Sequence, residues 1–259
     1  MTGVGELVDR IGVRLHPTRD DTATLPLSPA VVRNGEMLVA GMMLAADLAS
    51  GIRLHDAYVT TVLTTSFSFR RAARGYVGPV TAVAAPLFAD GRRAVDRIDF
   101  CNGEGGSIAT GLISFVVRRA DTPYSRDVYS KYRSAWTQPI EAPLSEAAGI
   151  EVADAATGRV TLHAGDDVRR EGGIVQGAFV TLLGEASALA FAEHTLQAPA
   201  VVESLNVDYL APVGNDPVAT EARWLAAPGE SDIEVVLHDD TTGSVLAVFV
   251  IGVARAISR

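Results

Sequence analysis

The chain has 259 residues, of which 48% are hydrophobic and 20% charged, and its formal net charge is −9 at pH 7. This composition is typical of a globular protein rather than a disordered or fibrous one. The negative charge argues against nonspecific nucleic-acid binding, which needs a basic face. Cys101 is the only cysteine, so we expect no internal disulfide and a cytoplasmic environment.

The first half of the chain predicts a strand region, a long apolar helix and then a run of strands. Segment 34–51 is apolar on nearly every side, which is typical of a helix surrounded by other structure. Asp47 interrupts it, so we do not expect it to span a membrane. Period-two alternation and proline-marked turns predict the strands. The expected strand regions are 13–27, 62–69, 78–84, 94–100 and 106–116.

The second half repeats this order at offsets of 137 to 140 residues. Its apolar helix covers 173–191, and Glu185 lies 138 positions after Asp47. A carboxylate is rarely buried unless it is paired or used, so both acids need an explanation. The corresponding strand regions are 150–164, 202–209, 216–222, 233–239 and 243–253.

A connector joins the two halves. Its prolines and charged residues predict a linker that crosses the surface, and Tyr132 and Trp136 indicate that it packs against the rest of the chain. We therefore predict an N-terminal domain over 1–121, a linker over 122–143 and a C-terminal domain over 144–259.

A helix that is apolar all round and a sheet with one apolar face bury each other if the sheet curls around the helix. We predict an α+β fold of two tandem hot-dog domains, each a curled antiparallel sheet wrapped around a long central helix. Such repeats pair by continuing one sheet into the other, which sets the two helices close to antiparallel. The expected assembly is an intramolecular pseudo-dimer, and further homo-oligomerisation stays open.

The helix motifs resemble those of the hot-dog thioesterase superfamily, particularly the PaaI-like acyl-CoA thioesterases. In that family the helix begins with a His-Gly-Gly type motif and carries Asp or Glu eight positions after the first glycine. Here Gln176-Gly177-Ala178 stands at the motif, with Glu185 eight positions after Gly177. Leu38-Val39-Ala40 stands at the same place in the first half, with Asp47 eight positions after Val39. The family histidine is therefore replaced in both repeats.

The resemblance implies hydrolysis of an acyl-CoA thioester without a metal or redox cofactor. Such a reaction needs a general base or a carboxylate nucleophile, and donors for the carbonyl oxygen. A helix N-terminus supplies such donors, and glycine lets a thioester approach the backbone closely. Gly177 fits this role, with Gln176 and Ala178 beside it.

Eight residues of helix rise about 12 Å, which is too far for Glu185 to serve a carbonyl held at Gly177. Each site must therefore combine an acid from one helix with the N-terminus of the other. We favour Asp47 with Gly177 and Gln176. The pseudo-symmetric alternative combines Glu185 with the N–H groups of Val39 and Ala40, and both sites could operate.

Other interpretations of these residues stay open. Asp47 and Glu185 could instead satisfy neighbouring polar groups, and Gln176 could be a structural amide that bonds a loop carbonyl. Arg70 and Arg71 are candidates for binding the phosphates of coenzyme A, against the alternative of a solvated loop.

The five histidines are scattered, which argues against a Ser-His-Asp hydrolase and a zinc site and makes a hydratase or dehydratase the weaker enzyme hypothesis. The alternative of another class is a non-catalytic acyl-CoA or lipid-binding protein.

Overall fold

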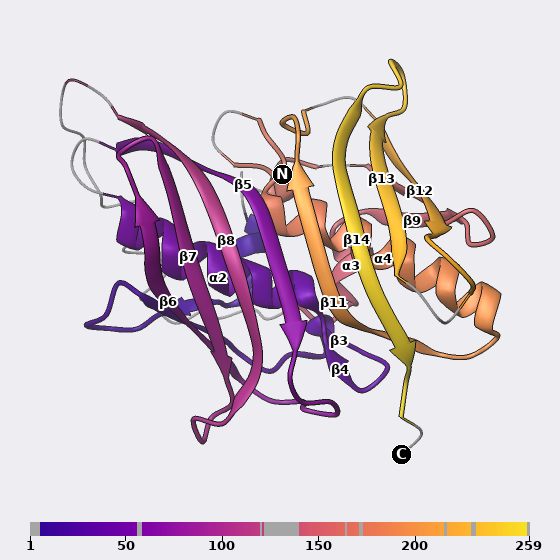
Figure 1. The fold of residues 1–259 in the computed structure, drawn as a ribbon, viewed down its shortest axis with the longest axis horizontal. Helices are drawn as coiled ribbons and strands as arrows, with labels where there is room; N and C mark the ends of the chain where they lie inside the picture. Colours follow the sequence, from indigo (N-terminus) through magenta and orange to yellow (C-terminus); the bar gives the residue numbers. More distant parts are fainter. Residues whose placement is uncertain are drawn as a thin grey trace.

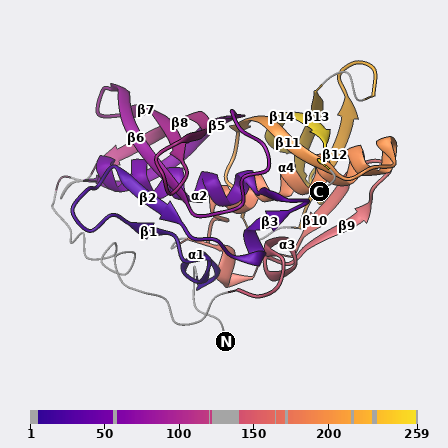
Figure 2. The ribbon, with the colours of Figure 1, turned by 90° about the horizontal axis from the view of Figure 1, so that it is seen from below.

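The computed structural model describes residues 6–55, 59–119, 121, 140–163, 165–170, 173–214, 217–228 and 232–257. Two long helices, α2 (Val39–Leu54) and α4 (Gly177–Leu196), lie against one face of a large antiparallel sheet. Figure 1 shows the sheet in front of the helices, and Figure 2 shows it arching over them. Most of the predicted linker, including Tyr132 and Trp136, lies outside the described residues.

The sheet has twelve strands in the order β1-β2-β6-β7-β8-β5-β11-β14-β13-β12-β10-β9. The strands of the first half are β1 (Arg14–Leu15), β2 (Thr22–Leu25), β5 (Val59–Arg71), β6 (Val80–Ala89), β7 (Arg93–Cys101) and β8 (Ser107–Arg119). Those of the second half are β9 (Ile150–Asp154), β10 (Arg159–Leu162), β11 (Ala200–Tyr209), β12 (Val218–Trp224), β13 (Ile233–Asp239) and β14 (Val245–Arg255). Each half therefore contains one long helix followed by four strands, as predicted.

Shorter elements complete the described part. They are α1 (Glu6–Ile11), α3 (Leu144–Ala147), the 3₁₀ turns Pro29–Val31 and Asp166–Val168, and the small hairpin of β3 (Val32–Arg33) and β4 (Glu36–Met37). The single strand regions expected over 13–27 and 150–164 are each two short paired strands. None of the described helices is long and apolar enough to cross a lipid bilayer.

The two halves join through antiparallel pairing of β5 with β11, which confirms that one sheet continues into the other. Ser68 pairs with Asn206 at the centre of this seam. These residues are 138 positions apart, the same offset that separates Asp47 from Glu185. The residues paired at the centre of the seam are thus separated by the same offset as the two acids, and the helices α2 and α4 of the two halves contact each other.

Close packing of helix on sheet follows from small residues at the contacts. A side chain at Gly184 would overlap the ring of Phe249, with its Cβ 2.6 Å from ring carbons. Glycine lets α4 approach β14 at this point. On the inner face of the sheet, Phe67, Phe69, Phe100 and Phe115 are fully buried. This shared core fixes the positions of the helices and of the acids they carry.

Candidate active site

Asp47, in the third turn of α2, lies at the N-terminus of α4. The side-chain amide of Gln176 donates to Asp47 Oδ2 at 2.9 Å, and the Gln176 Oε1 accepts from the backbone N–H of Ala178 at 2.5 Å. Gln176 is the N-cap of α4 and is buried. One glutamine side chain thus connects the carboxylate of the first half to the first helical turn of the second half, instead of bonding a loop carbonyl.

Two further side chains hold the Asp47 carboxylate. The hydroxyl of Thr64 on β5 donates to Oδ1 at 2.7 Å, and the guanidinium of Arg170 donates to Oδ2 at 2.5 Å. Arg170 also donates to the carbonyl of Val62 at 3.1 Å, so it is anchored on β5. These three donors fix the orientation of the carboxylate and leave part of its acceptor capacity unused.

Gly177 begins α4 beside this carboxylate and is partly exposed. Its N–H makes no hydrogen bond to any residue within the described ranges, whereas the next N–H is taken by Gln176. The carbonyl of Gly177 accepts from the hydroxyl of Tyr209 at 3.2 Å, and that hydroxyl also lies 2.6 Å from Thr181 Oγ1. Burial raises the pKa of Tyr209 well above its ordinary value, which keeps the phenol neutral.

Glu185 reaches the N-terminus of the other helix in a different way. Its two carboxylate oxygens accept from the backbone N–H groups of Val39 and Ala40, each at 2.9 Å. Burial raises the pKa of Glu185, and these two hydrogen bonds and the charge of Arg71 act in the opposite direction. Glu185 therefore caps α2 across the interface between the halves.

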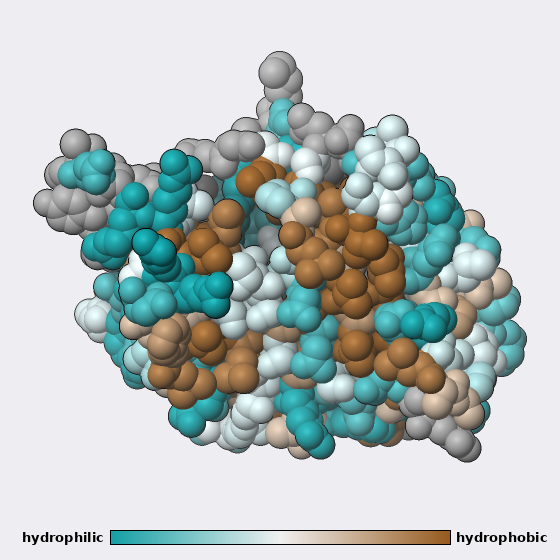
Figure 3. Space-filling view, turned by 45° about the horizontal axis from the view of Figure 1, so that its top comes forward, coloured by the Kyte–Doolittle hydropathy of each residue, from teal (hydrophilic) through white to brown (hydrophobic). Residues whose placement is uncertain are grey.

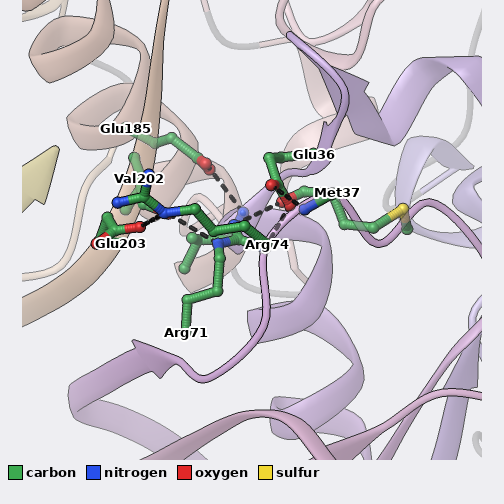
Figure 4. A network of polar contacts seen from close by, with 9 residues as sticks. Glu36, Met37, Arg71, Arg74, Glu185, Val202 and Glu203 are labelled. Carbon is green, nitrogen blue, oxygen red and sulfur yellow. Dashed lines mark hydrogen bonds and ion pairs between the residues drawn. The ribbon is translucent and has the colours of Figure 1, made fainter. Parts of the chain in front are cut away.

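A buried polar network surrounds this cap (Figure 4). Arg71 pairs with Glu36 at 3.2 Å and donates to the carbonyls of Met37 at 3.1 Å and Val202 at 3.0 Å. Glu36 also accepts from the N–H of Gly75. Burial lowers the pKa of Arg71, and the nearby acids Glu36 and Glu185 counteract that shift. The network therefore contains a buried ion pair between Arg71 and Glu36. The hydrogen bond from Arg71 to the Val202 carbonyl links β5 to β11.

The two pseudo-equivalent sites differ at each position that contacts the acid or helix end. The pairs of residues related by 138 positions are Asp47 and Glu185, Gln176 and Leu38, Thr64 and Val202, Gly177 and Val39, and Tyr209 and Arg71. At the Asp47 site, side chains donate to the carboxylate, and the N–H of Gly177 stays available. At the Glu185 site, the longer acid itself accepts from the backbone N–H groups of Val39 and Ala40. Leu38, the N-cap of α2, has no side-chain acceptor for these N–H groups, and the longer Glu185 side chain bonds them instead.

No family model and no curated protein matches the chain. Among solved structures, a conserved hot-dog protein from Alicyclobacillus acidocaldarius is similar with a TM-score of 0.62 and 14% identity, over 97% of this chain and 98% of that chain. The chain has the hot-dog fold. Acyl-CoA thioesterase II TesB2 from Mycobacterium marinum matches with a TM-score of 0.64 and 11% identity, over 97% of this chain and 98% of that chain. An acyl-ACP thioesterase from Bacteroides thetaiotaomicron matches with a TM-score of 0.56 and 15% identity, over 90% and 97%.

Hot-dog thioesterases are therefore among the structures that this chain resembles, and at these identities the likeness establishes the fold alone. The structure shows the surroundings of the residues that were expected to bind substrate. The N–H groups of Val39, Ala40 and Ala178 are already bonded by protein side chains, so they are not open to a substrate carbonyl. Arg71 is buried in its ion pair and cannot act as a solvated phosphate ligand.

Arg70 is exposed, but it lies on the other face of the sheet from α2 and α4. Phe67, Phe69 and Arg71 point inward along β5, so Arg70 points outward. It is therefore separated from Asp47 by the sheet itself, and the basic residue next to Asp47 is Arg170 instead.

Sequence reasoning missed Thr64 as a partner of Asp47 and gave Arg170 no part at the carboxylate.

The described residues include no group of three or more His, Cys, Asp and Glu side chains that could hold a metal ion. Ser187 bonds the carbonyl of Gly158 at 2.6 Å, so its hydroxyl has a structural partner.

Proposed function

We propose that this chain is a thioesterase that hydrolyses an acyl-CoA thioester at the composite site of Asp47, Gln176, Thr64 and Gly177. The observation that carries the proposal is the Gln176 bridge, which places a carboxylate beside a helix N-terminus with an available N–H. The names of similar structures, acyl-CoA thioesterase II and acyl-ACP thioesterase, support the same chemistry.

In the proposed mechanism Asp47 is the general base. It takes a proton from a water molecule as the water oxygen attacks the thioester carbonyl carbon. Thr64 and Arg170 hold the carboxylate in position, and Gln176 connects it to α4. The tetrahedral intermediate then collapses, the C–S bond breaks, and the proton held by Asp47 goes to the leaving thiolate.

The N-terminus of α4 stabilises the charge that develops on the carbonyl oxygen. The N–H of Gly177 donates to this oxyanion, and the helix dipole adds a favourable field. The missing side chain matters, because a Cβ at Gly177 would lie 3.2 Å from Cε of Met43 and would narrow the approach. Loss of one such donor costs about 2.7–4 kcal/mol of transition-state stabilisation in other hydrolases.

Under this proposal only one of the two pseudo-equivalent sites catalyses hydrolysis. Glu185 occupies the N–H groups of Val39 and Ala40 itself, so a thioester oxygen would have to displace a buried carboxylate. Glu185 is assigned a structural role that joins the repeats, in place of the catalytic role expected from the sequence.

The proposal treats the chain as two hot-dog repeats, 1–121 and 144–259, joined by a linker over 122–143, which form an intramolecular pseudo-dimer. The reaction requires no metal or redox cofactor, since a carboxylate and a backbone donor supply its chemistry. A cytoplasmic role in lipid metabolism is part of the same proposal.

One observation favours a non-catalytic acyl-CoA-binding protein as the second candidate. The carboxylate of Asp47 already accepts hydrogen bonds from Thr64, Arg170 and Gln176, an arrangement that also suits a purely structural acid. Acyl-CoA and acyl-ACP panels should be assayed for thiol release, with calorimetric titration of the same acyl-CoAs alongside. Hydrolysis that is lost in Asp47→Asn supports the thioesterase, whereas saturable binding without thiol release supports the second candidate and overturns the first.

A further inference from the structure

A polar groove crosses the outer face of the sheet, on the side opposite α2 and α4. Its volume is about 930 Å³, which lies in the size range of small-molecule sites. It runs from Arg97 on β7, across Leu112 on β8, Ser68 on β5 and Asn206 on β11, to Gly252 on β14. Figure 3 shows a polar strip between hydrophobic patches on this side of the molecule.

The register of the strands brings three hydrogen-bonding side chains together in this groove. Arg70 lies directly opposite Thr110 on one side and Ser204 on the other, and Asn206 is diagonal to it across the seam. Directly opposed residues have Cβ atoms about 4.5–5.5 Å apart and diagonal ones about 7–8 Å. Thr110 and Asn206 therefore flank Arg70 on the two neighbouring strands, where each can contact a ligand held by the guanidinium.

The acidic residues of the groove already have partners. Asp99 pairs with Arg97 at 3.4 Å, Glu203 pairs with Arg74, and Asp232 is also engaged by the protein. In contrast, the side chains of Arg70, Thr110 and Asn206 make no hydrogen bond or ion pair with any residue that the structure places. The groove therefore presents one uncompensated positive charge flanked by two neutral hydrogen-bonding groups.

At Gly252 on β14, the missing side chain leaves room for two polar side chains that border the groove. A Cβ at Gly252 would lie 2.9 Å from Asp232 Oδ1 and would also overlap the hydroxyl of Ser204. The Ser68 hydroxyl oxygen accepts from the N–H of Leu112 at 3.1 Å, which leaves its O–H as a further donor toward the groove. Ser68 therefore adds a hydroxyl donor to the lining of the groove.

We propose that this groove binds a small polar oxyanion, a phosphate monoester or a carboxylate, through Arg70, Thr110 and Asn206. The guanidinium provides a charge-assisted, fork-shaped contact, and the hydroxyl and amide bond the remaining oxygen atoms. This site is separate from the Asp47 site, because Thr64 and Arg70 are six residues apart on β5 and point to opposite faces of the sheet. It does not depend on the proposed thioesterase activity.

The test is an amide chemical-shift titration of the full ¹⁵N-labelled chain with inorganic phosphate, adenosine 5′-monophosphate and citrate, each against chloride at matched ionic strength. We expect at least one oxyanion to shift amides of 68–71, 110–112 and 204–206 saturably, with a Kd on the order of 1 mM or tighter. Arg70→Gln should weaken that binding roughly tenfold or more, and Asn206→Asp should weaken it through charge repulsion. Arg14→Gln, at an exposed position on β1 at the edge of the sheet, is the control and should leave it unchanged.

The pattern among the probes identifies the ligand class. Preference for adenosine 5′-monophosphate or phosphate indicates a phosphate site, and preference for citrate indicates a carboxylate site. The proposal is overturned if no oxyanion shifts these amides beyond the chloride control, or if Arg70→Gln binds as the wild type does while its spectrum elsewhere is unchanged.

Discussion

Replacement of Thr64 by valine removes one hydrogen bond from Asp47 with almost no change in side-chain volume. The Thr64 hydroxyl donates to Asp47 Oδ1 at 2.7 Å, and a hydrogen bond to a charged group is worth about 1.5–3 kcal/mol. If the carboxylate must be held in this orientation in the transition state, the variant loses the whole free energy of this hydrogen bond from transition-state stabilisation. At 1.36 kcal/mol per factor of ten, kcat/KM should fall roughly 10- to 150-fold.

The assay is thiol release from the best acyl-CoA substrate, with thermal unfolding measured on the same samples. Thr65→Val is the matched control, because Thr65 is the next residue of β5 and makes no hydrogen bond to Asp47. We expect Thr65→Val to keep wild-type kinetics within about twofold, because this change removes no hydrogen bond from the Asp47 carboxylate. Full activity in Thr64→Val, or an equal loss in both variants, would refute the role assigned to this hydroxyl.

Three further predictions concern the helix ends. Glu185→Ala leaves the N–H groups of Val39 and Ala40 without their acceptors and should reduce the free energy of unfolding by about 3 kcal/mol in chemical denaturation; an unchanged midpoint would contradict the capping role. Burial raises the folded pKa of Glu185 above 4.5, so the folded state binds protons more tightly than the unfolded state. The free energy of unfolding of the wild type should therefore fall relative to Glu185→Gln as pH rises from about 4.5 through that raised value; a rise in this difference would show that the sign is wrong. Gly177→Ala should lower kcat/KM about tenfold or more by bringing a Cβ to 3.2 Å from Met43 Cε, with little change in unfolding temperature, and wild-type turnover would remove Gly177 from the site.

The fold could be predicted from the sequence because the local patterns of strands and helices agree with the internal repeat. Alternating strands and two helices that are apolar all round can be buried only together, and the internal repeat shows the order twice. The expected strand 233–239 matches β13 residue for residue. The start of the second helix was less well defined, because the apolar run begins before Gln176, whose φ of −66° and ψ of 136° are still extended.

The position of Asp47 at the N-terminus of the opposite helix could be predicted from helix geometry. Its hydrogen-bond donors Thr64 and Arg170 could not. Alternation counted back from Phe69 and Phe67 would place Thr65 on the inner face. A bulge between Thr64 and Ser66 shifts the strand by one residue, so Thr64 faces Asp47 instead. The bulge depends on pairing with β8 and leaves no pattern in β5 alone.

The arginines illustrate a signal that was present in the sequence and was not used. The alternation that places Phe67 and Phe69 inside also places Arg71 inside and Arg70 outside, which separates two residues that the sequence analysis treated as one phosphate-binding pair. The different behaviour of Asp47 and Glu185 was less accessible, because it depends on which side chain bonds the N–H groups of the opposite helix.

Of the two related carboxylates, Asp47 is assigned as the catalytic base and Glu185 as a structural cap. The most direct measurement compares thiol release by Asp47→Asn and Glu185→Gln, isosteric changes at pseudo-equivalent positions, under conditions where both are folded. We predict that kcat falls at least 100-fold in Asp47→Asn and stays within about threefold of wild type in Glu185→Gln. Wild-type turnover in Asp47→Asn, or a comparable loss in folded Glu185→Gln, would contradict this assignment.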